Sequence, residues 1–331
     1  MKKKYNVYGI GNALVDIEFE VSEEFLDKHG VKKGVMTLVD EETQFQMIED
    51  INHAETVQKP GGSAANTVFA VSQFGGKAFY SCKVARDKFG DDYLQDMKDA
   101  GIDTNFDRQH RQDGITGKCL VMITDDADRT LNTFLGITST LSTDEIDEHA
   151  ISDSEYVYLE GYLVTSDTGL EAMKRAKKVA EDHEVKTALT LSDPSVVEAF
   201  KGRFEDVIGA SVDLLFCNED EARKYTGKSD LMEAREALKK EAKRFVITQG
   251  SNGAMIFDGD TFIDIEPYEV KAIDTNGAGD MFAGAFLYGI SDGLGYAASG
   301  KLASLACSKV VSQYGPRLKW HEVQDVRKKL V

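Results

Sequence analysis

Short apolar segments and amphipathic helical segments alternate along most of this chain, and that alternation restricts its fold more than any other feature. The apolar, β-branched segments have the length of strands and lie at 5–10, 77–84, 155–161, 185–192, 212–218 and 243–250. The helical segments between them lie at 63–74, 87–100, 167–182 and 231–242. This order predicts an α/β fold: a mostly parallel sheet with helices on both faces, joined by right-handed crossovers.

Two regions interrupt the alternation. They contain strand patterns that no crossover helix follows, such as "DIEFEV" and "GKCLVMI". We expect these strands to pair into a small antiparallel sheet that covers one end of the main sheet as a lid. The sequence contains no linker, low-complexity tract or internal repeat. It therefore predicts one α/β domain over residues 1–331, with lid segments inserted at about 12–40 and 114–138.

Charge and composition exclude several classes of partner. The 331 residues include 39 Lys and Arg against 57 Asp and Glu, and the net charge of −18 repels nucleic acid and acidic membrane surfaces. The start resembles a secretion signal, but its apolar part is short, contains Asn12 and ends at Asp16, so we interpret it as a first strand. No apolar segment is long enough for a membrane span.

The metal-binding and redox-active residues are scattered. Four cysteines form no Cys-x-x-Cys pair, so we expect buried thiols in a reducing, cytoplasmic compartment. Six histidines are equally dispersed, which indicates no transition-metal site. The expected partners are therefore small molecules.

Polar and glycine-rich loops follow the expected strands. These loops are "GIGNALVD" after the first strand, "KPGGSAANT" after Val57, "EGY" after Leu159, "NEDE" after Cys217 and "TQGSNG" after Ile247. Sheets of this class bind ligands at the carboxyl ends of their strands. The sequence thus predicts a binding site where these loops meet.

The stretch "DTNGAGD" at 274–280 places a carboxylate directly behind small residues. The backbone N–H groups of Gly277, Ala278 and Gly279 could converge on one anion at the start of a helix. Asp280 would then accept the proton of an attacking hydroxyl, while these groups stabilise the charge of a transferred phosphoryl group. Alternatively, Asp280 only caps the helix, and the motif taken alone slightly favours capping.

These stretches together resemble the large ribokinase/PfkB-type carbohydrate kinase family, which includes ribokinase and adenosine kinase. "DTNGAGD" is similar to its C-terminal signature, with Asn276 where a second threonine is usual. Residues 59–91 resemble its N-terminal signature and "NEDE" at 218–221 its Asn-x-x-Glu magnesium motif, in consistent order over residues 5–325. The resemblance implies a ribokinase-like three-layer sandwich with a small β-sheet lid, and ATP-dependent phosphorylation of a primary hydroxyl with Asp280 as base.

"GIGNALVDI" resembles the adenosine kinase branch of this family, which places an Asn and an Asp at the positions of Asn12 and Asp16. A carboxylate there can accept hydrogen bonds from both hydroxyls of a vicinal diol. The resemblance thus implies that Asp16 binds a ribose, assisted by Asn66 and the backbone of Gly61 and Gly62. The alternative is that Asp16 merely ends a strand. A dinucleotide site at Gly9 and Gly11 is not supported, because the third glycine of that pattern is missing.

A nucleoside also carries a flat, apolar base. Tyr162 falls where the adenosine kinase branch places aromatic residues, and the lid segments supply Met36, Leu38, Phe134 and Leu135. Such side chains can stack on a purine. Most apolar residues of this kind are nevertheless ordinary core residues.

The nucleotide side of the site is expected in two further loops. "VITQGSNGAMIF" at 246–257 resembles the family's ATP loop, in which Thr248, Gly250 and Gly253 would admit phosphate and ribose. Asn218 and Glu221 lie three residues apart and could hold Mg²⁺ through water. The alternative is a helix cap with an acidic first turn. The family also often uses K⁺ beside its C-terminal signature.

Three functional hypotheses of different class remain. The first is a kinase for adenosine or a related purine ribonucleoside, and the second is a sugar kinase of the same fold. The third is a nucleotide-binding regulatory protein without turnover, which the intact Asp280 argues against. The expected state is a monomer or a homodimer formed through the lid.

Overall fold

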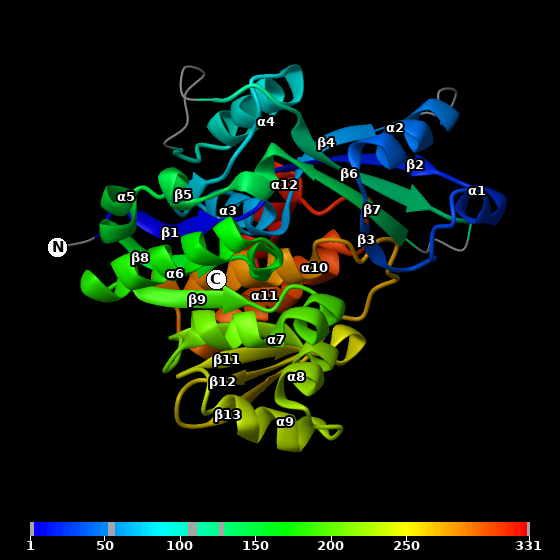
Figure 1. Ribbon diagram of the computed structural model, residues 1–331. Coiled ribbons are helices and arrows are strands. Elements are labelled where there is room, and N and C mark those ends of the chain that lie inside the picture. Colours follow the sequence, from blue (N-terminus) through cyan, green and yellow to red (C-terminus); the bar gives the residue numbers. More distant parts are fainter. Residues whose placement is uncertain (1–2, 52–56, 105–110, 126–128, 330–331) are drawn as a thin grey trace.

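The computed structural model describes residues 3–51, 57–104, 111–125 and 129–329 (Figure 1). Its main sheet has eight strands in the order β13-β12-β11-β10-β9-β8-β1-β5. The pairings from β5 to β11 are parallel, and those of β12 and β13 are antiparallel. The bounds are β1 Tyr5–Ile10, β5 Ala78–Ser81, β8 Ser154–Leu159, β9 Lys186–Thr190, β10 Leu214–Asn218, β11 Phe245–Thr248, β12 Ala254–Phe257 and β13 Phe262–Ile265.

Helices cover both faces of this sheet and bury one apolar core on each. The helices of the first core are α3 Ser63–Gln73, α4 Lys88–Asp99, α10 Ala278–Ser291, α11 Tyr296–Val310 and α12 Trp320–Lys328. Those of the second core are α5 Glu148–Ser152, α6 Asp167–Asp182, α7 Pro194–Ile208, α8 Glu219–Thr226 and α9 Leu231–Leu238. Alternate residues of the central strands enter opposite cores, because successive side chains of a strand point to opposite faces. The predicted three-layer α/β fold is confirmed.

Local sequence fixes where several of these helices begin. The side chain of Asp87 accepts a hydrogen bond from Gly90 N–H at the start of α4, and that of Ser166 does the same for Gly169 N–H in α6. Asp193 caps α7, whose first residue is a proline. Such caps pair N–H groups that the helix itself leaves unpaired. The cap of α7 stands three residues after the end of β9, at the carboxyl end of the main sheet.

A smaller sheet forms the lid, in the order β3-β7-β6-β2-β4. Its bounds are β2 Leu14–Glu20, β3 Met36–Leu38, β4 Val57–Gly61, β6 Thr116–Ile123 and β7 Arg129–Gly136. The expected antiparallel sheet is wrong in part, because β2 pairs with β6, and β3 with β7, in parallel. The chain runs from β2 and β3 to β6 and β7 through α3, β5 and α4 of the main domain, and this long connection returns it to the same end of the lid sheet and permits these parallel pairs.

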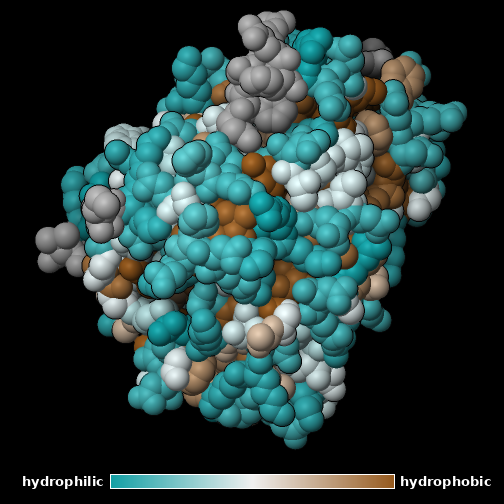
Figure 2. Space-filling view, turned by 60° about the vertical axis from the view of Figure 1, so that its left-hand side comes forward, coloured by the Kyte–Doolittle hydropathy of each residue, from teal (hydrophilic) through white to brown (hydrophobic). Residues whose placement is uncertain are grey.

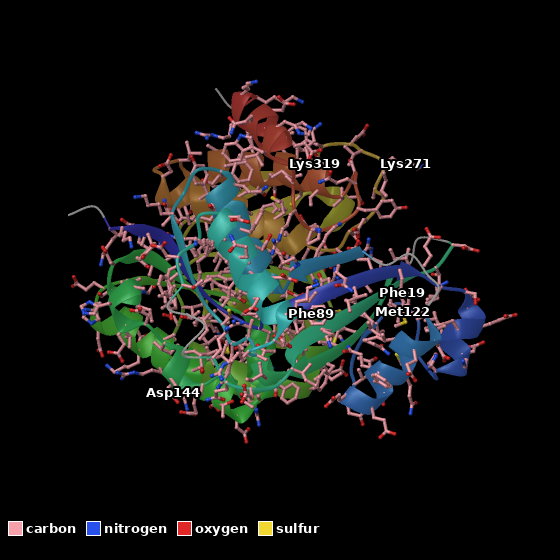
Figure 3. All side chains as sticks on the ribbon, turned by 90° about the horizontal axis from the view of Figure 1, so that it is seen from above. Phe19, Phe89, Met122, Asp144, Lys271 and Lys319 are labelled. Atoms are coloured by element: carbon pink, nitrogen blue, oxygen red, sulfur yellow. The ribbon has the colours of Figure 1, made fainter. Side chains whose placement is uncertain are left out.

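The outer face of the lid sheet is covered by two helices, α1 Glu23–Lys28 and α2 Glu41–Asp50. Leu26 and Met47 of these helices join Phe19 and Met122 of the lid strands in a separate small core. Figure 3 shows Phe19 and Met122 beside each other on the lid, next to the two helices. The opposite face of the lid sheet is therefore the one that is turned toward the main sheet.

The molecular surface agrees with the charge of the chain. Figure 2 shows a face that is mostly hydrophilic, with small apolar patches between the polar side chains. Cys82, Cys119, Cys217 and Cys307 are all free, and the first three are buried. Within the described residues, no helix is both long and apolar enough to cross a bilayer.

Candidate active site

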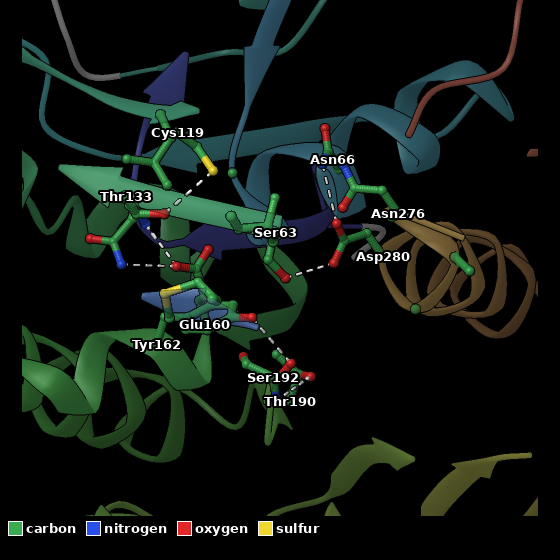
Figure 4. Close-up of a pocket in the computed structure, with 18 of the residues that line it drawn as sticks. Ser63, Asn66, Cys119, Thr133, Glu160, Tyr162, Thr190, Ser192, Asn276 and Asp280 are labelled. Carbon is green, nitrogen blue, oxygen red and sulfur yellow. Dashed lines mark hydrogen bonds between the residues drawn. The ribbon is translucent and has the colours of Figure 1, made fainter. Parts of the chain in front are cut away.

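A cavity of about 360 Å³ opens between the lid and the carboxyl ends of the main strands (Figure 4). Residues directly after β1, β8 and β9 line it, together with the ends of β10 and β11 and the start of α10. Lid residues of β2, β3, β6 and β7 close it from the other side. The loops singled out in the sequence thus meet in one place, as the topology of parallel strands requires.

Asp280 lies in the first turn of α10 and borders this cavity. Ser63 Oγ donates to its Oδ1 at 2.6 Å, and Asn66 Nδ2 donates to its Oδ2 at 3.2 Å. Both donors belong to α3, and Figure 4 shows them converging on the carboxylate. Burial raises the pKa of Asp280 to about 6, and the two hydrogen bonds oppose this rise. A carboxyl group of this kind is ionised at neutral pH and basic enough to accept a proton.

The turn before Asp280 requires glycine at one position and offers free donors at others. Gly277 has φ 72°, and a Cβ atom there would lie 2.2 Å from the Cβ of Pro316. Ala278 N–H donates to Thr275 O at 3.2 Å, so it is already engaged. Among the described residues, the N–H groups of Gly279 and Asp280 have no partner and α10 has no side-chain cap. The helix start can therefore donate to an anion.

Asp16, on β2, presents a buried carboxylate to the same cavity. Asp16 is 8% exposed. Among the described residues, none donates a hydrogen bond to its carboxylate or forms an ion pair with it. A Cβ atom at Gly61 would lie 2.3 Å from Asp16 Oδ2, so only glycine leaves room for this carboxylate. Burial raises the pKa of Asp16 to about 7, and neighbouring Glu18 adds to the rise.

The remaining residues expected around a ribose lie beside Asp16. Asn66 lines the cavity, and Gly62, at φ 98°, starts α3 with its backbone close to Asn12 O. Asn12 also lines the cavity, but both ends of its amide are engaged: Nδ2 donates to Glu160 Oε1 at 3.1 Å, and Oδ1 accepts from Thr138 Oγ1 at 3.4 Å.

Glu160 was not singled out from the sequence, although it follows β8 directly in the "EGY" loop. It is 1% exposed, and its Oε2 accepts from Ala64 N–H at 2.8 Å while Oε1 accepts from Asn12 N–H at 3.1 Å. It thereby joins the end of β1 to the start of α3. Burial raises the pKa of Glu160 to about 7.

The lid contributes an apolar wall. The apolar lid residues that line the cavity are Leu14, Met36, Leu38, Val121, Leu131 and Leu135. Phe134 is absent from the lining, which corrects our expectation for it: alternate residues of β7 face the cavity, and Phe134 lies between two of them. Tyr162 does line the cavity, and its hydroxyl donates to Ser192 O at 3.4 Å.

Asn218 and Glu221 lie at the start of α8 on the far side of the cavity. They form a capping box, in which Glu221 N–H donates to Asn218 Oδ1 at 2.8 Å and Asn218 N–H donates to Glu221 Oε2 at 3.0 Å. Burial raises the pKa of Glu221 to about 7. Each carboxylate oxygen has a second lone pair, so the pair can still accept from water around a metal ion. Among the described residues, no three Asp, Glu, His or Cys side chains are arranged so that they could hold a metal ion directly.

The three residues expected in the ATP loop differ in their position relative to the cavity. Thr248 ends β11 and lines the cavity, whereas Gly250 and Gly253 do not. A Cβ atom at Gly253 would lie 2.0 Å from Ile265 O, so this glycine permits the turn to pack against β13. Gly250, at φ 55°, has open space around it. The site as a whole combines a basic carboxylate, a helix start with free donors and a second, unpaired carboxylate.

Comparisons with known proteins agree with this chemistry. A family model described as pfkB family carbohydrate kinase matches residues 33–322. The adenosine kinase of Saccharomyces cerevisiae is 26% identical over 328 residues, which cover 93% of this chain and 95% of that enzyme.

Solved structures show the same architecture. A probable sugar kinase from Rhizobium etli superposes with a TM-score of 0.92 at 30% identity, covering 99% of this chain and all of that one. The adenosine kinase of Sinorhizobium meliloti superposes with a TM-score of 0.91, also at 30% identity, covering 98% of this chain and 99% of that one.

Proposed function

Because the chain belongs to the pfkB family of carbohydrate kinases, it is a phosphotransferase with an alcohol acceptor, and we propose that this acceptor is a purine ribonucleoside. The proposed reaction is phosphorylation of the 5′ hydroxyl, with adenosine as the preferred substrate. The phosphoryl donor is ATP, as the family implies. One observation carries the choice of a ribonucleoside: the buried carboxylate of Asp16 faces the cavity with no partner among the described residues.

An unpaired buried carboxylate is costly unless a ligand supplies donors. Two neighbouring hydroxyls of a ribose supply two donors at the spacing of one carboxylate. Gly61 leaves the space that this approach requires. With the 2′ and 3′ hydroxyls on Asp16, the 5′ hydroxyl would be directed to Asp280, which borders the same cavity.

The transfer step uses groups of this chain at both ends. Asp280 accepts the proton as the O–H bond of the 5′ hydroxyl breaks, and the oxygen forms a bond to the terminal phosphorus of ATP. The bond from this phosphorus to the bridging oxygen breaks, and ADP leaves with the electron pair. The free N–H groups of Gly279 and Asp280 donate to the transferred group.

The apolar lid wall favours a base over a free sugar. If the ligand were only a pentose, part of this apolar wall would remain in contact with water. The residues concerned are Leu14, Met36, Leu131 and Leu135. A purine covers such a surface and gains roughly 25 cal/mol for each Å² of apolar area removed from water. Tyr162 borders the same space and can contact the base.

Mg²⁺ fits the nucleotide side only through water. Asn218 and Glu221 would hold its hydration shell, since their direct contacts are used within the capping box. The ion would neutralise part of the triphosphate charge, which matters for a chain of net charge −18.

The test is ATP consumption with adenosine, inosine, guanosine, ribose and fructose as acceptors. We expect turnover with a purine ribonucleoside and formation of its 5′ monophosphate. Phosphorylation of free sugars alone would contradict the nucleoside proposal. It would support a sugar kinase, the second candidate, which the similarity to the probable sugar kinase of Rhizobium etli favours.

A further inference from the structure

The loop between α11 and α12 packs against the start of α10 through residues 315–317. Gly315 N–H donates to Asp274 Oδ2 at 2.7 Å, at the first residue of the signature. Pro316 occupies the space beside Gly277 that a side chain would need. The next residue is Arg317. The loop thus places this arginine immediately behind the residues assigned to phosphoryl transfer.

The side chain of Arg317 is held firmly. Its Nη1 donates to Asp96 Oδ2 at 2.6 Å, and its guanidinium lies over the ring of Phe69 at 4.1 Å. Only 15% of the side chain is exposed. These contacts direct Nε toward Asn66 Oδ1, to which it donates at 3.0 Å.

This contact decides which end of the Asn66 amide faces Asp280. Arginine has donors only, so the amide oxygen must face Arg317. The amide nitrogen then faces Asp280 Oδ2, to which it donates at 3.2 Å. In the opposite orientation the amide oxygen would meet the carboxylate and the nitrogen would meet the guanidinium. Both contacts would be repulsive.

Arg317 also differs in charge from the other ionisable groups around Asp280. Those other groups are Asp16 on β2, Tyr158 on β8, Glu160 and Tyr162 after β8, and Cys307 on α11. Arg317 completes the set of groups that interact with Asp280. Among them, Arg317 carries the positive charge. It lowers the pKa of Asp280 and that of Asp16, against the effect of burial.

We propose that Arg317 is a positioning residue for the base: through Asn66 it orients the Asp280 carboxylate, and its guanidinium supplies a positive charge to a site formed mostly of buried acids. The inference rests on the proposed function, because it assigns Arg317 to the same phosphoryl transfer. The signature motifs do not contain Arg317, which reaches the site only through the fold.

The first test needs no substrate. The carboxyl carbon of Asp280 is followed by NMR titration in the parent, Arg317→Met and Arg317→Lys proteins, with Asp280→Asn identifying the signal. We expect the methionine variant to raise the pKa of Asp280 by about one unit and the lysine variant to leave it near the parent value. Arg327→Met, which removes an exposed arginine of α12, is the matched control and should change nothing.

The second test separates charge from geometry by kinetics. If the pKa of Asp280 rises by about one unit, kcat/KM of Arg317→Met falls about fivefold further at pH 6 than at pH 8. Arg317→Lys keeps the charge but not the fork of donors, so its kcat should fall by a similar factor at all pH values.

An unshifted Asp280 titration in folded Arg317→Met would overturn the proposal. If that variant does not fold, Arg317→Gln, which is neutral but keeps a donor, carries the same test. Should the parent phosphorylate none of the acceptors, the proposed function fails, yet the titration still decides whether Arg317 acts on Asp280. The two failures are therefore distinguishable.

Discussion

Asp280 is placed where both its protonation and its direction matter. Ser63 and Asn66 hold its two oxygens, and burial raises its pKa to about 6. The N–H groups beside it remain available for an anion. At the residue scale the site therefore depends on a single carboxylate on α10 whose side-chain hydrogen-bond donors come from α3.

Replacing Asp280 with asparagine should abolish the base without disturbing its surroundings. The new amide can accept from Asn66 and donate to Ser63 Oγ, so the fold and nucleotide binding should persist. We expect kcat to fall by at least ~10²-fold, the usual contribution of a positioned base. Initial rates over pH 5 to 9 check this. In the parent the rate should fall below about pH 6, where Asp280 is protonated. Near-parental turnover in the variant would refute the role.

The role of Asp16 can be tested with a substrate that lacks one of the two ribose hydroxyls. If its carboxylate accepts from the 2′ and 3′ hydroxyls, the 2′-deoxynucleoside leaves a buried acceptor unpaired and should react up to ~10⁴-fold less efficiently. Asp16→Ala should lose most activity toward the ribonucleoside, and most of this discrimination with it. Measuring kcat/KM for both substrates in both proteins forms a double cycle, in which a general folding defect cancels. Full retention of the parent's preference would show that Asp16 does not bind the diol.

At the scale of elements, the lid and the main sheet differ in how they are held. The main strands lie between two apolar cores, whereas the lid strands face the cavity on one side and the small core with α1 and α2 on the other. A sheet supported on one face can move relative to the body when the cavity fills.

We expect the lid to close over the nucleoside, since phosphoryl transfer must exclude water as a competing acceptor. Hydrogen exchange of β6 and β7 amides should slow when adenosine is added together with a nonhydrolysable ATP analogue. Amides of β5, which belongs to the main sheet and contributes no residue to the cavity lining, serve as the internal control and should exchange at the same rate throughout. Identical lid exchange with and without these ligands would count against closure.

The sequence predicted the elements of the main sheet well, because an apolar strand followed by an amphipathic helix leaves few alternatives. It did not predict the parallel pairs of the lid, since alternating hydrophobicity does not encode the direction of a partner strand. It also could not choose between Phe134 and Leu135, which lie on opposite faces of β7, because both are apolar and the pattern does not tell which face meets the cavity.

Site residues within a motif could be expected, whereas those contributed by packing could not. Asp280 and Asp16 stand in stretches that resemble a family pattern. Glu160 directly follows a strand, and that position was the available signal. Arg317 lies in an ordinary loop and gains its place from the packing of Pro316 against Gly277 and from its own contacts with Asp96 and Phe69.

The whole molecule should be a monomer. The outer face of the lid sheet is covered by α1 and α2, with Phe19 and Met122 buried beneath them, so within the described residues a second lid cannot pack directly on that face of the sheet. Light scattering coupled to size exclusion should give a mass near 36.5 kDa. A mass of twice this value at micromolar concentration would show that the protein dimerises by another surface.

Stability should also reflect the buried acids of the site. A carboxyl group whose pKa is raised by folding binds more protons in the folded than in the unfolded state. The free energy of unfolding therefore falls as pH rises from about 4, the unfolded pKa, through the folded value. For Asp16 this window ends near pH 7.

Asp16→Asn should thus raise the free energy of unfolding at pH 8, by about 1 kcal/mol or more, and leave it nearly unchanged at pH 4.5. Urea unfolding at both pH values measures the difference. Asp144→Asn, which replaces an exposed aspartate, is the control and should show no such pH dependence. A gain of equal size at both pH values would mean that titration of Asp16 does not cause it.

The support of α10 by residues 315–317 has a consequence for synthesis. The ribosome makes this segment after the lid, the main sheet and the signature, yet Asp274, Gly277 and Asn66 all depend on it for their neighbours. A nascent chain can form its sheet early, since domains fold as their segments emerge. It should nevertheless stay inactive until its last loop docks, so that shortened translation products neither consume ATP nor compete for nucleoside.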